Sequence, residues 1–237
     1  MKVKVLFDKV AEKKELVTGW GVSFLIEDEV LFDTGENGEW LVKNIKELKV
    51  GINKIKAVAI SHDHWDHIGG LKAILNLNPN IKVYSPFRFS KEFEEELGSL
   101  KENSIEVKEF LEVSKGIFIT GKIPGEYRGK DMPEQAVVLD TDKGFTIITG
   151  CAHPGVIKII EVVRNRFPGK SIYAVFGGFH MIESSKEDVE SVVKKFKALG
   201  VIKAGPTHCS GDLAEEEFRR EYKDNFIEVV VGKELEV

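Results

Sequence analysis

The chain has 237 residues, of which 42% are hydrophobic and 31% are charged, and its formal net charge is −5. This composition excludes a disordered or fibrous protein, and the length suffices for a buried core in one domain spanning residues 1–237. The sequence lacks an apolar run near the roughly 20 residues that cross a bilayer, and its negative charge disfavours nucleic acid as a partner.

Strands and helices are expected to alternate along the first half of the chain. Short apolar or alternating segments predict strands at residues 3–7, 21–26, 29–32 and 55–60. Apolar residues at helical spacing predict one helix around Leu41 and Ile45, and another that begins after Gly69-Gly70. The charged segment 86–103 is expected to form a surface helix.

The second half repeats this alternation, with hairpins mixed in. Further strands are predicted at residues 116–120, 136–140, 145–149, 172–176 and 201–204. One helix is expected at 156–166, and Ser185 is a suitable N-cap for another that stops before Gly200. A final helix and strand close the chain. The pattern predicts a layered α/β protein with mixed sheets.

The cysteine content and the N-terminal sequence indicate a reducing compartment. The only two cysteines, Cys151 and Cys209, do not make a disulfide framework. The first residues carry a charge every few positions and lack the apolar core of a signal peptide. We therefore expect a cytoplasmic protein. Glutamine occurs once, at Gln135, while lysine and glutamate are abundant, which is typical of a heat-adapted, thermostable protein.

All six histidines lie just beyond an apolar, strand-like run, in turns rich in Gly, Pro, Ser or Asp. They are His62, His64, His67, His153, His180 and His208. Chemistry in layered α/β folds gathers at strand ends, so this placement favours one convergent site over six unrelated surface histidines.

The strongest signal is the cluster His62-x-His64-x-Asp66-His67. Alternate residues of an extended segment point the same way, so His62 and His64 can bind one cation together. The turn at Asp66-His67 then offers a carboxylate and an imidazole to a neighbouring cation. Imidazole and carboxylate ligands favour Zn, Fe, Mn, Ni or Co over Ca or Mg. A polar surface loop is the structural alternative.

The motifs of this chain resemble those of the metallo-β-lactamase superfamily along nearly its whole length. In order, they are Gly19-Trp20-Gly21, Phe32-Asp33-Thr34-Gly35, the histidine cluster, Gly150-Cys151-Ala152-His153-Pro154-Gly155, Gly177-Gly178-Phe179-His180 and Thr207-His208-Cys209-Ser210-Gly211. Together they are most similar to the branch of dihydropterin ribofuranosyl-aminobenzene phosphate synthase-like proteins.

This resemblance implies a four-layer αββα sandwich of two mixed sheets flanked by helices, with a dinuclear metal site at one edge. It implies two divalent transition-metal ions, with zinc as the default. His62 and His64 would bind the first ion, while Asp66, His67 and His208 would bind the second.

The chain departs from the superfamily pattern at the remaining ligands. The histidine expected about twenty residues before a Gly-Asp pair is absent, and that pair is replaced by Gly150-Cys151. We expect His153 to supply the missing ligand to the first ion, with Asp131 or Glu134 as alternatives. Cys151 is interpreted as a thiolate ligand, a wall of the site or a small buried hydrophobe.

Three further residues are candidates for supporting roles. The resemblance places Asp33 behind the histidine loop, where it would accept a hydrogen bond and fix that loop; a turn-capping role is the alternative. His180 is expected to contact substrate or donate a proton, although a structural role is also consistent. Trp20, between two glycines, is either an aromatic lid or a packing residue.

Two cations about 3.5–4 Å apart lower the pKa of a shared water toward about 7, and Asp66 is expected to orient the hydroxide for attack. The sequence therefore predicts a hydrolase acting on an ester, phosphoester, lactone or amide bond of a small-molecule substrate. Pterin-pathway condensation, by resemblance, and iron-dependent redox chemistry are the enzymatic alternatives. A non-catalytic, metal-stabilised binding module would instead have every metal position filled by protein.

Overall fold

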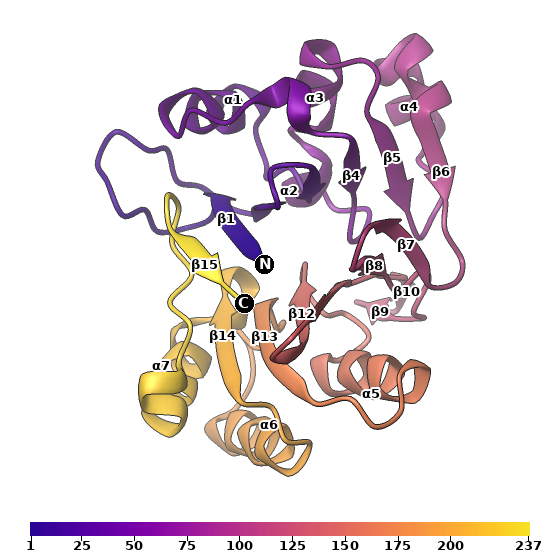
Figure 1. Ribbon diagram of the computed structural model, residues 1–237. Helices are drawn as coiled ribbons and strands as arrows, with labels where there is room; N and C mark the ends of the chain where they lie inside the picture. Colours follow the sequence, from indigo (N-terminus) through magenta and orange to yellow (C-terminus); the bar gives the residue numbers. More distant parts are fainter.

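Two mixed β-sheets lie face to face in the computed structural model, which describes residues 1–237, and helices cover both outer faces (Figure 1). The first sheet has the strand order β15-β1-β2-β3-β4-β5-β6, and the second has the order β14-β13-β12-β11-β8-β7. This arrangement confirms the predicted αββα fold class. The helices are all too short or too polar to span a lipid bilayer.

The first sheet collects strands from the N-terminal half and one from the C-terminus. Its strands are β1 (Lys2–Phe7), β2 (Ser23–Ile26), β3 (Val30–Phe32), β4 (Ala57–Ala59), β5 (Lys82–Ser85), β6 (Ser104–Glu106) and β15 (Glu234–Glu236). Strands β3 to β6 run parallel, whereas β1 pairs antiparallel with both β2 and β15. The outer face carries α1 (Gly38–Glu47), α3 (Leu71–Leu77) and α4 (Lys91–Leu97) (Figure 1).

The second sheet is built from the other half of the chain. Its strands are β7 (Leu111–Ser114), β8 (Ile117–Ile119), β11 (Val137–Thr141), β12 (Gly144–Thr149), β13 (Ile172–Gly178) and β14 (Lys203–Thr207). Strands β12, β13 and β14 run parallel. The helices of this half are α5 (Val156–Arg166), α6 (Lys186–Ala198) and α7 (Asp212–Tyr222). A separate two-stranded hairpin, β9 (Glu126–Tyr127) and β10 (Lys130–Asp131), leaves the chain between β8 and β11.

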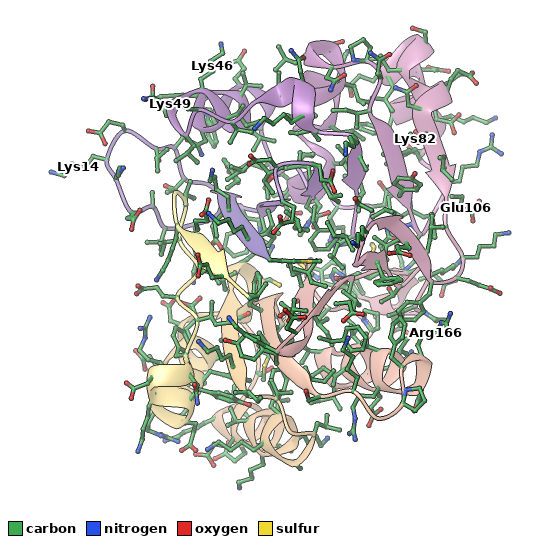
Figure 2. All side chains as sticks on the ribbon, in the orientation of Figure 1. Lys14, Lys46, Lys49, Lys82, Glu106 and Arg166 are labelled. Atoms are coloured by element: carbon green, nitrogen blue, oxygen red, sulfur yellow. The ribbon has the colours of Figure 1, made fainter.

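Both faces of the central strands are buried, which explains their nearly continuous apolar sequences. On β12, Phe145 and Ile147 pack against the helices, whereas Ile148 faces the opposite sheet. Between the sheets the Phe24 and Phe176 rings meet edge to face, with centroids 5.7 Å apart. Charged side chains such as Lys46 and Lys49 instead project from the outer surface (Figure 2).

The helix predicted over 86–103 is shorter than expected. Ser90 caps α4 by accepting a hydrogen bond from the Phe93 amide, and the helix ends before Gly98, whose φ of +60° lies in the left-handed region. A 3-10 segment from Gly98 to Asn103 and the short strand β6 follow. The Ser185 N-cap is confirmed, because its hydroxyl accepts from the Asp188 amide at the start of α6.

Candidate metal centre

The site forms where the carboxyl ends of parallel strands from the two sheets meet. The loop after β4 carries His62, the loop after β12 carries Cys151 and His153, and β14 leads directly into His208. Strands that run parallel end at the same edge of a sheet, so these loops converge although they are distant in sequence. The short helix α2 (Trp65–Ile68) then turns Asp66 and His67 toward the same point.

Three imidazoles make a first group of candidate metal ligands. His64 has extended backbone, and its Nδ1 lies 3.0 Å from His62 Nε2, so the two side chains point to one place. The His153 ring lies 4.5 Å from that of His62 and 5.0 Å from that of His64, measured between centroids. One nitrogen from each residue lies within 4.8 Å of the others, a spacing at which all three can bind one ion.

A carboxylate and two imidazoles make a second group beside the first. Asp66 Oδ2 lies 3.2 Å from His208 Nε2 and 3.5 Å from His67 Nε2. The His67 ring also lies 4.1 Å from that of His62, so the two groups adjoin. The structure therefore brings together the four residues of the sequence cluster and both later histidines in two neighbouring triads.

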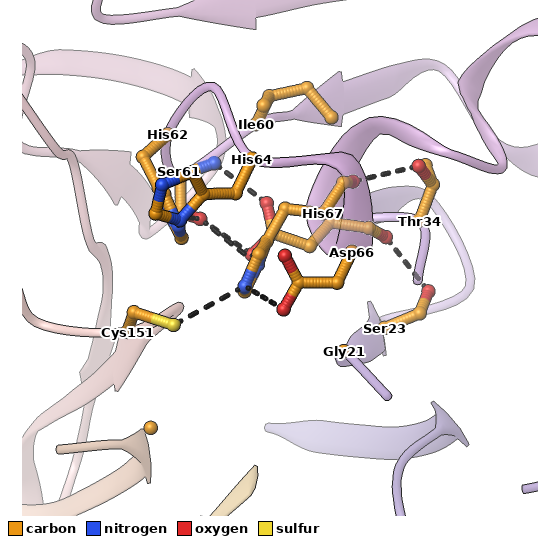
Figure 3. Close-up of polar contacts among 12 residues, drawn as sticks. Gly21, Ser23, Thr34, Ile60, Ser61, His62, His64, Asp66, His67 and Cys151 are labelled. Carbon is orange, nitrogen blue, oxygen red and sulfur yellow. Dashed lines mark hydrogen bonds and ion pairs between the residues drawn. The ribbon is translucent and has the colours of Figure 1, made fainter. Parts of the chain in front are cut away.

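Hydrogen bonds orient one histidine of each group, His62 of the first and His67 of the second. Buried Asp33 accepts from His67 Nδ1 at 2.7 Å, and Ser61 Oγ, itself bonded to Asp33, lies 2.8 Å from His62 Nδ1. The Ser61 amide also donates to Asp33 at 2.6 Å. Figure 3 shows the resulting network around the loop. With Nδ1 occupied, Nε2 of each ring is left to face the centre.

Glu134 orients His153 through hydrogen bonds, as Asp33 and Ser61 orient His67 and His62. Its fully buried carboxylate accepts from His153 Nδ1 at 3.1 Å and from three consecutive backbone amides, those of Cys151, Ala152 and His153. Glu134 is thus directed toward the loop that carries His153 and belongs to neither triad. Asp131, the other acidic alternative, is exposed on β10 and belongs to neither triad.

Two buried nitrogen atoms show that the residues present fit a bound metal. The Nε2 atoms of His153 and His208 are inaccessible to solvent and make no hydrogen bond, although His208 Nε2 lies near Asp66. A buried polar atom without a partner costs free energy, which a coordinated cation would recover. The donor set of imidazoles, one carboxylate and thiols suits zinc or a similar transition metal.

Cys151 lies between the two triads. Its buried Sγ is 3.4 Å from His67 Nε2 (Figure 3). It groups with His62 and His67 and also with His153 and His180. Cys209, which the sequence did not single out, is also buried, and its Sγ lies 3.7 Å from the Cys151 carbonyl oxygen. Cys151 is therefore positioned to contact an ion in either triad.

The charge states of the two triads differ in the metal-free chain. Burial and nearby imidazoles hold the pKa of His62 well below its usual range and lower that of His64 to about 4, so both rings are neutral. Burial opposes charge on His67, but Asp33 and Asp66 outweigh it and raise its pKa to about 10. Burial also opposes ionisation of Asp66, yet the adjacent His208 and His67 keep its pKa far below normal. The second triad thus contains a charged pair, the Asp66 carboxylate and the protonated His67, whereas His62 and His64 of the first triad are uncharged.

Unusual backbone geometry occurs at several positions of the site. Four non-glycine residues that follow strands there have φ in the left-handed region: Asp33, Ala152, His180 and His208. Such conformations are uncommon and are retained where a side chain must be aimed. Two glycines permit close approach: a Cβ on Gly21 would lie 1.9 Å from the Asp66 carbonyl oxygen, and one on Gly150 would lie 2.1 Å from Ser61 Oγ.

Aromatic residues border the centre on its open side. The Trp20 ring lies 4.8 Å from the His208 ring and remains partly exposed, a position that allows either predicted role, the aromatic lid or the packing residue. His180 is exposed, with its ring 4.6 Å from that of His153. Tyr127 on β9 was not anticipated, because a lone tyrosine in a short, charged hairpin has no distinguishing pattern.

Comparisons with known proteins agree with this geometry. A family model described as the metallo-beta-lactamase superfamily matches residues 21–208. A 7,8-dihydropterin-6-methyl-4-(beta-D-ribofuranosyl)-aminobenzene-5'-phosphate synthase of Methanocaldococcus jannaschii is 30% identical, over 90% of this chain and 88% of its own length. An uncharacterised protein of the same organism is 31% identical, over 98% of each chain.

Solved structures give the same result. Tm1679, described as a metal-dependent hydrolase of the beta-lactamase superfamily, superposes with a TM-score of 0.81 at 30% identity, covering 100% of this chain and 99% of its own. Human tRNase Z, short form, superposes with a TM-score of 0.65 at 14% identity, covering 100% and 99%, and supports the fold alone.

Proposed function

The chain belongs to the metallo-beta-lactamase superfamily, and from this premise we propose that it is a hydrolase that depends on two divalent metal ions. The observation that carries the proposal is the pair of adjoining triads, with the buried Nε2 atoms of His153 and His208 left without hydrogen bonds. Catalytic metal sites typically have ligands that other protein groups orient, and they leave a coordination position of the metal open, whereas structural sites do not.

In this proposal the first ion is held by His62, His64 and His153, and the second by Asp66, His67 and His208, with zinc as the metal to test first. Bound ions would supply Lewis acidity to a carbonyl or phosphoryl oxygen and lower the pKa of a water that they share toward about 7. Three protein ligands for each ion leave room for substrate.

The remaining steps are assigned to side chains. Asp66 directs Oδ2 toward His208 and His67, so its other oxygen, Oδ1, is available to accept a hydrogen bond from the attacking water and orient it. His180, exposed beside His153, is placed to donate a proton from its imidazole to the leaving group. Trp20 shields the side of the site next to His208.

Metal analysis together with a hydrolysis screen tests this function. Protein reconstituted with Zn, Mn, Co, Ni or Fe should hold about two ions per chain. With at least one of these metals it should hydrolyse a phosphodiester, thioester, lactone or β-lactam substrate. A chelator should abolish turnover, and returning the metal should restore it. Fully loaded protein that leaves all four substrate classes intact contradicts the proposal.

A second candidate function is pterin-pathway condensation. It is favoured by one observation, the 30% identity to the Methanocaldococcus jannaschii synthase over most of both chains. The same loaded protein, incubated with the substrates of that synthase, should then form the coupled pterin product. Product formation without hydrolysis of any screened substrate would replace the first candidate by the second.

We further propose that Cys151 binds metal through its thiolate. Cobalt-substituted protein should show a sulfur-to-cobalt charge-transfer band in the near ultraviolet, and Cys151→Ser should abolish it, because Cys151 is the thiol that groups with members of both triads. Cys209→Ser is the matched control, since Cys209 is equally buried but groups with only one triad member, His208, and this variant should retain the band. A band that survives in Cys151→Ser contradicts thiolate ligation by this residue.

A further inference from the structure

The hairpin β9–β10 extends from the second sheet as an ordered arm. At its base, Ile123 forms an antiparallel bridge with Glu134, the residue that orients His153. Tyr127 pairs with Lys130 near the tip. The two turn residues, Arg128 and Gly129, have φ of +50° and +75°, as a tight two-residue hairpin turn requires. The base of the hairpin is thus bridged to a residue that orients a candidate metal ligand.

The two faces of this hairpin carry opposite charges. Directly paired residues point to the same face of a hairpin, and their neighbours point to the other. Tyr127 and Lys130 therefore share one face, while Glu126 and Asp131 share the opposite face. Both acidic groups lie on one side, and the ammonium lies on the side of the tyrosine.

Tyr127 identifies the face that looks into the site. Three histidine rings of the metal centre lie against it, with centroids 5.0, 5.2 and 5.4 Å away: His64, His153 and His180. Lys130 shares this face of the hairpin with Tyr127 and is exposed. The Arg128 guanidinium lies over the Tyr127 ring, 5.1 Å from its centroid, and adds a second cation at the same place.

Neither cation is neutralised by the protein. No carboxylate oxygen lies within 4.0 Å of the charged nitrogens of Arg128 or Lys130. The chain as a whole carries a net charge of −5, so two unpaired cations beside its metal centre go against the average charge of the surface. Such a local field favours an anionic ligand at the mouth of a site.

We infer that this hairpin is a substrate-recognition arm that selects small molecules bearing an anionic substituent, a phosphate or a carboxylate. Lys130 and Arg128 bind the anion, and the exposed part of Tyr127 packs on the adjoining non-polar part of the substrate. The inference rests on the proposed function, because it names the substrate class of the same site. The hairpin thereby gives the site a second group of residues that binds an anion, separate from the metal ions.

Binding of simple probes to the zinc-loaded full chain tests the inference without requiring turnover. Phenyl phosphate, benzoate and the neutral analogue benzamide are titrated by calorimetry into the parent and into Arg128→Gln/Lys130→Gln. Removing two exposed charges should weaken phenyl phosphate, benzoate or both about tenfold and leave benzamide within about twofold. A loss confined to one anion identifies phosphate or carboxylate as the preferred group.

The matched control is Lys82→Gln/Arg164→Gln, which removes the same charge at exposed positions away from the site. Lys82 begins β5 at the end opposite the metal centre, and Arg164 lies in the last turn of α5. The control should bind every probe like the parent, and both variants should keep the parent's zinc content and melting temperature. Parent-like affinity of the hairpin variant for both anions overturns the inference, even if hydrolysis is intact. Conversely, a tenfold loss of affinity for an anionic probe in the hairpin variant supports the inference even if the hydrolysis screen detects no turnover.

Discussion

Replacing Asp66 by asparagine is expected to lower metal-dependent turnover about a thousandfold while the fold persists. The carboxylate supplies the only negative charge of the second triad and lies beside the imidazoles of both His67 and His208. Asparagine has nearly the same shape as aspartate but carries no charge. It places an amide group where a carboxylate oxygen lay beside His67 and His208. The loss corresponds to about 4 kcal/mol of transition-state stabilisation. Steady-state kinetics on the best substrate of the screen measure it.

The control for this prediction lies in the same loop. Asp63 is exposed, three residues before Asp66, and belongs to neither triad. Asp63→Asn should therefore retain turnover within about twofold of the parent. Metal analysis of both variants separates a loss of the second ion from a loss of water orientation. If Asp66→Asn turns over like the parent, the role assigned to this carboxylate is wrong.

Replacing Glu134 by alanine is expected to have the largest effect on stability. Its buried carboxylate accepts four hydrogen bonds, three of them from successive amides in the loop that carries His153. Alanine leaves these donors buried without a partner, which should lower the free energy of unfolding by about 3–5 kcal/mol. For a chain of this size the melting temperature should fall by about 10 °C. Thermal and denaturant unfolding measure both quantities.

The same substitution should weaken the first metal site, because nothing then fixes Nδ1 of His153. Glu134→Gln retains one accepting oxygen and should fall between alanine and the parent in stability. Glu126→Ala removes an exposed glutamate from the neighbouring hairpin and should leave stability and metal content unchanged. Parent-like unfolding of Glu134→Ala would show that the loop is held by other contacts.

Several parts of the fold were predictable because they depend on local sequence. The strand before the histidine cluster, the helix at 156–166 and the Ser185 cap were all expected and are confirmed. Long apolar or periodic segments specify their own structure, and a capping hydroxyl acts within three residues. Strands β5, β6 and β7 were missed, because each is short and lacks a clear pattern.

The helix expected over 86–103 shows where local reasoning fails. Its charged sequence suits a surface helix, and the first part does form α4. The chain then takes a left-handed conformation at Gly98 and continues to β6, which adds to the edge of the first sheet beside β5. Sheet pairing is a contact between segments distant in sequence, so helix propensity does not reveal it.

The sequence by itself determined that three imidazoles and a carboxylate lie together at the end of one strand, because His62, His64, Asp66 and His67 are close neighbours directly after the apolar segment 55–60. Only the tertiary structure decided which distant groups complete their surroundings. Cys151 contacts His67 although 84 positions separate them in the chain, and Glu134 is directed toward the loop of His153 and joins neither triad. Likewise, only the pairing of Tyr127 with Lys130 in the hairpin places the tyrosine and the lysine on the same face. A side chain's role depends on the direction in which the folded backbone points it, and adjacency in sequence fixes that direction only within a few residues.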